Sequence, residues 1–137
     1  MFSNATKYAI RTVLLLASKD GLEKYKVSDI AKKLDIPKPF LSKILQKLAK
    51  ANLVSSAKGR GGGFYMTGEN LDKTLLDIID CIDGRNVLDE CILGQPTCSD
   101  ENPCPLHRYY KDIKRDLLMV ISDASVGRLS IDLKQTV

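Results

Sequence analysis

The 137-residue chain has no tryptophan, a single histidine and no long hydrophobic run. Its longest apolar stretch, Val13 to Ala17, is far shorter than the roughly 20 residues that span a bilayer. The N-terminus, Met1 to Ala9, lacks the basic, apolar and small-residue regions of a secretory signal peptide. These absences argue against a membrane protein and a secreted one, so we expect a cytoplasmic protein with no membrane partner.

The chain also does not require disulfide bonds. A domain near this size buries roughly two-thirds of the surface of its unfolded chain, which is enough to fold without cross-links. In the cytoplasm, the four cysteines are therefore expected to be free, metal-binding or redox-active rather than structural.

Charge divides the sequence into three parts. Residues 1–68 carry 13 Lys and Arg against 4 Asp and Glu, a net charge of +9, whereas residues 69–104 carry a net charge of −7 and residues 105–137 a net charge of +2. A basic segment beside an acidic one indicates a polyanion-binding module joined to something else, although lysines that merely solvate helices give the same excess. We predict a DNA-binding domain over 1–68, a helix with a cysteine-bearing loop over 69–104, and a dimerisation helix with a tail over 105–137.

Apolar residues recur with a helical period in three consecutive segments of the first part. The first helix is predicted to begin at Ser3 or Asn4 and end at Asp20-Gly21, the second to be a short helix capped by Ser28, and the third to run from about Pro37 to Ala51. Two helices joined by a turn of three or four residues are the outline of a helix-turn-helix.

The outward side of the third helix carries a row of hydrogen-bond donors. Residues near its N-terminus are expected to lie closest to base edges, Gln46 can pair with adenine, and the lysines are expected to hold phosphates. The alternative is an ordinary solvated helix face. The predicted DNA contacts on this helix are Lys38, Pro39, Phe40, Ser42, Lys43, Gln46 and Lys47.

A β-hairpin is predicted after the third helix, with strands at Leu53–Ala57 and Phe64–Thr67. Its glycine-rich tip places Lys58 and Arg60 where they can reach phosphates or a minor groove, so both are predicted DNA contacts. A nucleotide-binding P-loop is rejected because no Gly-Lys-Ser/Thr motif follows and the next residues are strand-like. An ordinary mobile hairpin tip remains the alternative.

The remainder is predicted to be helical apart from one long loop. A fourth helix begins at about Thr74 with Cys81 on its apolar stripe, periodicity is absent from Asp83 to Pro103, and a last long helix follows from Leu106, with a weakly patterned tail from Gly127. The last helix has an apolar stripe that one copy of the chain has little left to cover, so we expect it to pair with a second copy. The predicted fold is mainly α with a small β-hairpin.

The loop and the start of the last helix contain the spacing C-x6-C-x5-C-x2-H, formed by Cys91, Cys98, Cys104 and His107. Three thiolates and one imidazole can ligate zinc or an iron–sulfur cluster, and the spacing alone does not separate the two. A reversible disulfide between two of the cysteines is a further possibility. A cysteine–histidine nucleophile pair is disfavoured, because no third orienting residue or oxyanion donor is evident, so no enzyme activity is expected.

Four stretches together resemble one family of proteins. They are Lys7-Tyr8-Ala9, Val27-Ser28-Asp29-Ile30-Ala31, Leu41–Leu48 and Gly61-Gly62-Gly63-Phe64. They are similar to the Rrf-type family of bacterial winged-helix regulators, which includes IscR-like and NsrR-like sensors. The chain departs from the family pattern at Asp35, where glycine is usual, and at Arg60, where proline is frequent. The resemblance implies a homodimer that binds double-stranded DNA sequence-specifically, usually as a repressor, and two-fold symmetry implies a palindromic operator.

The resemblance also implies a role for the cysteines. Sensing members of the family carry three closely spaced cysteines in this loop, and IscR-like members add a histidine two residues after the third. Cys91, Cys98, Cys104 and His107 therefore resemble the ligands of a 2Fe–2S cluster, with a 4Fe–4S cluster and zinc as alternatives. We expect cluster binding or the redox state of this loop to modulate operator affinity.

Overall fold

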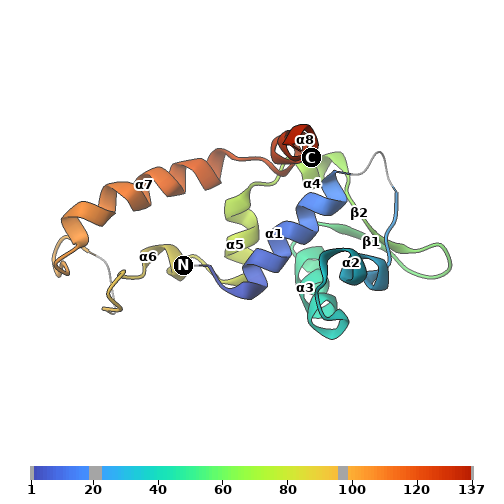
Figure 1. Ribbon diagram of the computed structural model, residues 1–137, viewed down its shortest axis with the longest axis horizontal. Coiled ribbons are helices and arrows are strands. Elements are labelled where there is room, and N and C mark those ends of the chain that lie inside the picture. Colours follow the sequence, from blue (N-terminus) through green and yellow to red (C-terminus); the bar gives the residue numbers. More distant parts are fainter. Residues whose placement is uncertain (1, 19–22, 96–98, 137) are drawn as a thin grey trace.

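The computed structural model describes residues 2–18, 23–95 and 99–136. Figure 1 shows a head from which one long helix, α7, extends as an arm. The elements are α1 (Asn4–Ala17), α2 (Val27–Leu34), α3 (Lys38–Lys50), β1 (Ser55–Ala57), β2 (Gly63–Tyr65), α4 (Gly68–Leu71), α5 (Leu75–Ile82), α6 (Asn86–Asp89), α7 (His107–Asp123) and α8 (Val126–Thr136). Among the described residues, no helix combines the length and the apolar character that crossing a membrane requires. The predicted class, mainly helical with a small β-hairpin, is confirmed.

Helix α1 runs through the centre of the head. Its N-cap is Ser3, one of the two predicted residues, whose Oγ accepts a hydrogen bond from the N–H of Thr6 at 3.1 Å. Ala9 and Val13 on its inward stripe are fully buried. The helix ends at Ala17, whereas the predicted end at Asp20-Gly21 lies outside the described residues. Because α1 contacts α2, α3, α5 and α8, it joins all the layers of the head.

The helix-turn-helix consists of α2 and α3. Helix α2 begins one residue before the predicted cap: Lys26 is the N-cap and makes no side-chain capping bond, so the assignment of Ser28 is wrong. The reason is that the Lys26 carbonyl already accepts from the N–H of Asp29 and Ile30, which places Ser28 inside the first turn. Asp35 ends α2 in the left-handed conformation (φ 55°, ψ 50°), as an Asp tolerates.

The hairpin is shorter than predicted, because only three residues of each strand pair, with Ser56 opposite Phe64. It is anchored to the segment before α2 by two backbone hydrogen bonds between Tyr25 and Phe64, at 2.8 and 2.9 Å. Gly63 allows this approach. It has φ +148°, and a Cβ there would lie 2.7 Å from the Tyr25 carbonyl oxygen. The β1–β2 hairpin, which we call the wing, is therefore fixed at its base to the rest of the head.

Two capping boxes follow the hairpin. Thr67 and Asn70 form one at the start of α4, a short helix that was not predicted, and Thr74 and Asp77 form the other at the start of α5. Asn70 is buried and also donates to the Asn52 carbonyl at 2.7 Å, which ties α4 to the end of α3. These local bonds fix where α4 and α5 begin.

The C-terminal tail is helical, although its apolar pattern from Gly127 onward is weak. The chain turns at Ala124 and continues as α8, which packs against α1 and α4, with Val126 fully buried. Ser125 begins this helix by accepting from the Arg128 N–H at 3.2 Å. Helix α8 therefore belongs to the head, whereas α7 extends away from it on the same side as α6 (Figure 1).

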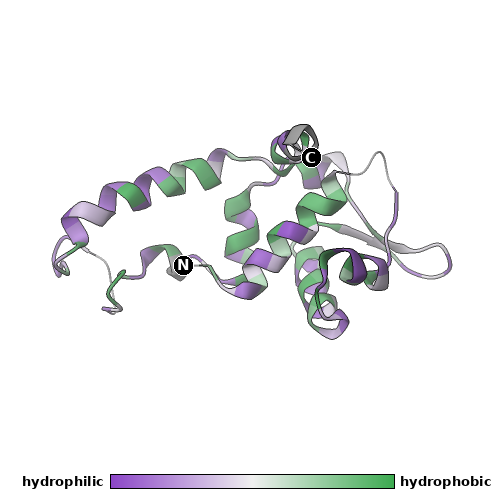
Figure 2. Cartoon of the chain, viewed as in Figure 1, coloured by the Kyte–Doolittle hydropathy of each residue, from purple (hydrophilic) through white to green (hydrophobic). Residues whose placement is uncertain are grey.

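Helix α7 leaves much of its apolar surface uncovered, and its ribbon in Figure 2 contains both hydrophilic and hydrophobic residues. Its buried residues are His107 at the start and Ile121 near the end. Its large apolar residues that are exposed are Tyr109, Ile113, Leu118, Met119 and Val120. A helix face of this kind is typical of a contact surface rather than of a solvated helix.

The end of α5 is tied to the start of α1. The carboxylate of Asp83 accepts from the Ser3 N–H at 3.0 Å and from the Ser3 Oγ–H at 2.5 Å. Partial burial raises the pKa of this carboxyl, but the hydrogen bonds from Ser3 outweigh burial and hold the pKa below its ordinary value. Asp83 opens the segment that carries the cysteines, so this segment is joined directly to α1.

We predict that Asp83→Asn lowers the free energy of unfolding by about 1 kcal/mol at neutral pH, because the amide cannot accept both bonds. Since the folded pKa lies below the unfolded value, the stabilisation is present above the unfolded pKa and is lost as pH falls through the folded pKa. Urea unfolding from pH 7 to pH 3 measures both effects. Asp72→Asn, at an exposed carboxylate, is the control, and an equal pH slope in wild type and Asp83→Asn would contradict the prediction.

Candidate DNA interface and cysteine site

Helix α3 has one buried side and one exposed side. Leu41, Ile44, Leu45 and Leu48 are buried, and they hold the helix against the rest of the head. Six of the seven predicted contact residues on α3 are exposed. The seventh, Ser42, is half-buried, and its hydroxyl donates to the Lys38 carbonyl at 2.9 Å. The structure therefore presents the predicted row of donors on one side of a rigid helix.

The tip of the wing exposes the other two predicted contacts, Lys58 and Arg60. The tip is closed by a hydrogen bond from the Gly62 N–H to the Gly59 carbonyl at 3.0 Å, and Gly59 and Gly61 both have positive φ. No side chain shields the backbone at these glycines, so the tip can approach a phosphate closely. The wing and α3 thus supply two separate cationic elements.

A cleft lies between the first turns of α1 and α3. Two of its residues come from α1 and were missed by sequence reasoning, because they lie 30 or more positions before α3: Asn4 and Tyr8. The rings of Tyr8 and Phe40 meet edge to face, with centroids 5.7 Å apart. The lining is otherwise made of Pro37, Pro39 and Lys43.

The structure brings two of the four predicted metal ligands together. Cys91 and Cys104 are both buried, and their thiols are hydrogen-bonded to each other. Burial raises the pKa of both thiols. At Cys91 it is outweighed by hydrogen bonds from the backbone N–H groups of residues 93–95 and from the Cys104 thiol, so its pKa is lowered, whereas that of Cys104 is raised. Cys91 is therefore the thiol of this pair that ionises first.

His107 begins α7 next to this pair. Its side chain is buried, its backbone N–H donates to the Cys104 carbonyl at 3.0 Å, and its Nε2 lies 2.8 Å from Oδ1 of Asp100. The hydrogen bond to His107, followed by the charge of Lys111, lowers the pKa of Asp100. Cys98, the remaining predicted ligand, lies outside the described residues.

The donor set suits a soft metal centre, because two buried thiols lie side by side and the imidazole beside them contacts a carboxylate, as metal-ligating histidines often do. Over 2–18, 23–95 and 99–136, no three such side chains gather closely enough to hold a metal ion. The residues fit an iron–sulfur or zinc site in chemistry, and the described part of the site holds two thiols in contact.

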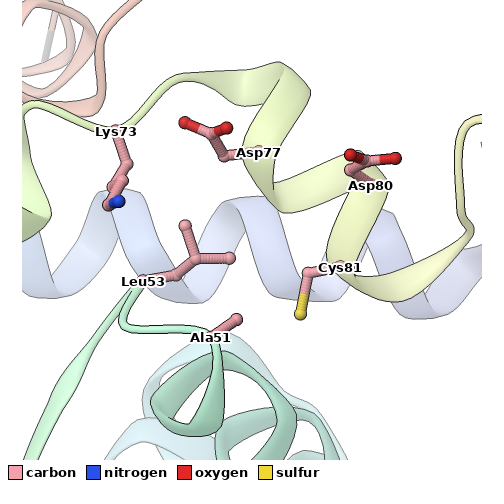
Figure 3. Close-up of a pocket in the computed structure, with 6 residues that line it drawn as sticks. All are labelled: Ala51, Leu53, Lys73, Asp77, Asp80 and Cys81. Carbon is pink, nitrogen blue, oxygen red and sulfur yellow. The ribbon is translucent and has the colours of Figure 1, made fainter.

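Cys81 has a different environment from the other described cysteines. Figure 3 shows it in a pocket lined also by Ala51, Leu53, Lys73, Asp77 and Asp80. It is half-buried and packs against the edge of the core. Its Sγ–H donates to the Lys47 carbonyl at 3.5 Å, and burial raises the pKa of the thiol. Cys81 is thus a weakly nucleophilic thiol, separate from the Cys91–Cys104 pair.

Solved structures with the same fold support this architecture. The chain superposes on CymR, the global cysteine regulator of B. subtilis, with a TM-score of 0.74 and 24% identity, covering 95% of each chain. It superposes on T. potens IscR with a TM-score of 0.74 and 20% identity, covering 99% of this chain and 90% of the other. These likenesses establish the winged-helix fold.

Sequence similarity extends over the same length. A protein of Aquifex aeolicus (strain VF5), whose name describes an HTH-type transcriptional regulator, is 35% identical over 120 residues, which is 85% of this chain and 82% of the relative. Residues 2–131 match the Rrf2 family, described as iron-dependent transcriptional regulators. The chain therefore belongs to the Rrf2 family, and it is a winged-helix, DNA-binding transcription regulator rather than an enzyme.

Proposed function

We propose that the protein is a homodimeric repressor in the cytoplasm that binds a palindromic operator, and that an iron–sulfur cluster between α5 and α7 sets its operator affinity. The observation that carries the proposal is the two-sided nature of α3: a fully buried apolar stripe on one side and exposed lysines on the other. A rigid helix of this kind fits the major groove, which is about 12 Å wide.

Within this proposal the residues have separate roles. The first turn of α3, formed by Lys38, Pro39 and Phe40, approaches base edges most closely. Gln46, further along the same helix, pairs with adenine. Lys43 and Lys47 neutralise phosphates on either side of the groove. Ser42, whose hydroxyl is engaged by the Lys38 carbonyl, contributes by close approach rather than as a free donor. Lys58 and Arg60 hold the flanking backbone or enter the minor groove.

We predict that Lys58→Ala and Arg60→Ala each weaken operator binding and lower the slope of log Kobs against log salt concentration by about one phosphate contact. Fluorescence anisotropy from 50 to 300 mM salt measures both quantities. Arg128→Ala is the matched control, because Arg128 is an exposed cation on α8, at the opposite side of the head from α3 in Figure 1. An unchanged slope in both wing variants would remove the wing from the interface.

The exposed face of α7 is proposed as the dimer contact. Tyr109, Ile113 and Val120 follow helical spacing on one side of the arm, and Ile113 is 58% exposed in the single chain. Two copies related by a two-fold axis would bury these stripes against each other. Such a dimer places two α3 helices about 34 Å apart, one turn of duplex DNA, as a palindromic operator requires.

We predict that Ile113→Glu gives a folded monomer, because an exposed residue can be charged without disturbing the head whereas a buried dimer contact cannot. Sedimentation velocity reports the mass, and circular dichroism reports the fold. Operator affinity should fall at least tenfold, since one half-site remains. Asp116→Asn, an exposed polar change on the same helix, should stay dimeric. A dimeric Ile113→Glu variant would reject this surface.

Cys91, Cys98, Cys104 and His107 are the proposed ligands, with 2Fe–2S favoured by the Cys₃His set and 4Fe–4S as the alternative. A bound cluster supplies a redox-sensitive bond between the loop and α7. Cys91 and Cys104 already meet in the protein alone, and the acceptance of backbone N–H bonds by Cys91 favours its thiolate, the form that ligates. Asp100 orients the imidazole of His107 from outside the ligand set.

The coupling between this site and α3 is proposed to run through α1. The loop begins at Asp83, which holds Ser3, the cap of α1, and α1 contacts α3 through Tyr8 and Phe40. At its other end the loop continues into α7, the proposed dimer helix. Ordering the loop therefore fixes both the reading head and the dimer arm, with an expected coupling of about 1–3 kcal/mol, or 5–150-fold in affinity.

We predict that Cys98→Ala abolishes the visible absorbance of anaerobically purified protein and its bound iron and sulfide, because one cluster ligand is removed. Cys81→Ala is the matched control, since Cys81 lies in a separate pocket, and it should keep the chromophore. Absorption spectra with iron, sulfide and zinc analysis make the measurement. A coloured Cys98→Ala variant would exclude this ligand set.

A second candidate keeps the same fold and DNA surface but uses zinc or thiol chemistry at the loop. The specific observation in its favour is the direct contact between the Cys91 and Cys104 thiols, with one pKa lowered, which is the arrangement that favours disulfide formation. Zinc without sulfide in the metal analysis, or a Cys91–Cys104 disulfide in mass spectrometry of oxidised protein, would favour this candidate over the cluster.

A further inference from the structure

The cleft between α1 and α3 opens beside the first turn of α3. It encloses about 520 Å³ and is lined by Asn4, Tyr8, Pro37, Pro39, Phe40 and Lys43. Its walls are two aromatic rings and two prolines, and Phe40 is 42% exposed. The exposed part of the Phe40 ring is apolar surface, and a partner that removed it from water on binding would gain free energy.

The chemistry of the lining defines that partner. Phe40, Pro37 and Pro39 have side chains that can neither donate nor accept a hydrogen bond, so they select an apolar group. Among the described residues that line the cleft, Lys43 alone is charged, so an anion close to the apolar group is favoured. A small apolar group beside an anion describes a thymine C5-methyl group next to its phosphate.

The position of the cleft favours DNA over a free small molecule. Pro39 and Phe40 lie in the first turn of α3, the part of a recognition helix that comes closest to base edges. Lys43 and Lys47 continue the same exposed side of the helix, so the cleft is continuous with the cationic surface assigned to DNA. A ligand in the cleft would therefore share its surroundings with the operator.

We infer that the methyl group of one thymine in each operator half-site enters this cleft, and that Phe40 is a residue that determines specificity for an A·T pair there. Tyr8 acts as a positioning residue, because its edge-to-face contact at 5.7 Å and 88° fixes the ring of Phe40 against the cleft. The inference rests on the proposed function, since it concerns the same DNA surface, and it adds to it the identity of the base that is read.

The test begins with operator selection from a random duplex library using the full-length wild-type protein. Each thymine of the selected half-site is then replaced by deoxyuridine, which lacks only the methyl group. At one position per half-site, the replacement is expected to weaken wild-type binding about three- to tenfold. For Phe40→Ala the thymine and deoxyuridine duplexes should bind equally well.

Three further variants complete the design. Lys58→Ala should weaken binding to both duplexes by the same factor, because the wing does not touch this methyl group. Tyr8→Leu should reduce the methyl preference while keeping the melting temperature close to that of wild type, which separates positioning from loss of fold. Phe40→Leu, which keeps an apolar side chain, should retain part of the preference and stands in if Phe40→Ala fails to fold.

The outcomes are distinct. An operator with no methyl effect at any thymine, or a methyl effect that persists in both Phe40 variants, overturns the inference and leaves the DNA-binding proposal intact. Failure to enrich any duplex overturns both. A methyl effect that is lost in the Phe40 variants and kept in Lys58→Ala supports the inference.

Discussion

The burial of one side of α3 is the constraint on which the rest of the molecule depends. Leu41, Leu45 and Leu48 are completely inaccessible, and they pack where α1, α2 and α5 converge. Rotating α3 by one residue would place a lysine in this space, and an unpaired buried charge is far more costly than the loss of one contact. The packing that stabilises the head therefore also decides which donors face outward, so fold and DNA surface are specified by the same residues.

Helix α1 connects the remaining parts to that surface. Its first turn is held by Asp83, which opens the cysteine-bearing segment, and one turn further on Tyr8 meets the ring of Phe40. Its opposite end packs against α8, as Figure 1 shows. A change at the loop that displaces Asp83 thus acts on the turn of α1 that lines the cleft beside α3. Coupling of this kind is reciprocal: if one state of the loop raises the affinity for DNA by a given factor, bound DNA favours that state of the loop by the same factor.

The sequence predicts what depends on near neighbours along the chain. The stripe of α3 and the cap at Ser3 are local features, and both are found as expected; the left-handed Asp35 is local as well. The contacts that assemble the site are not local: Ser3 with Asp83, Tyr8 with Phe40 and the two buried thiols join residues 13 to 80 positions apart. No periodicity encodes such pairs. Helix α8 did have a local signal, the capping Ser125, but the weak apolar pattern after Gly127 concealed it.

The location of the cysteine pair far along the arm has a mechanical consequence. Helix α7 is joined to the head at its C-terminal base, where the Leu75 N–H donates to the Ala124 carbonyl at 3.1 Å and the Val126 N–H to the Lys73 carbonyl at 2.7 Å. Its other end continues through the loop to Asp83, and the interaction between the Cys91 and Cys104 thiols joins the segment after α5 to the start of α7. Opening that contact removes one of the links at this end of the arm, where Lys114 Nζ also donates to the Glu90 carbonyl at 3.0 Å. Within the proposed function, where the arm is the dimer helix, losing the interaction between these two thiols would let the distance between the two α3 helices of a dimer vary.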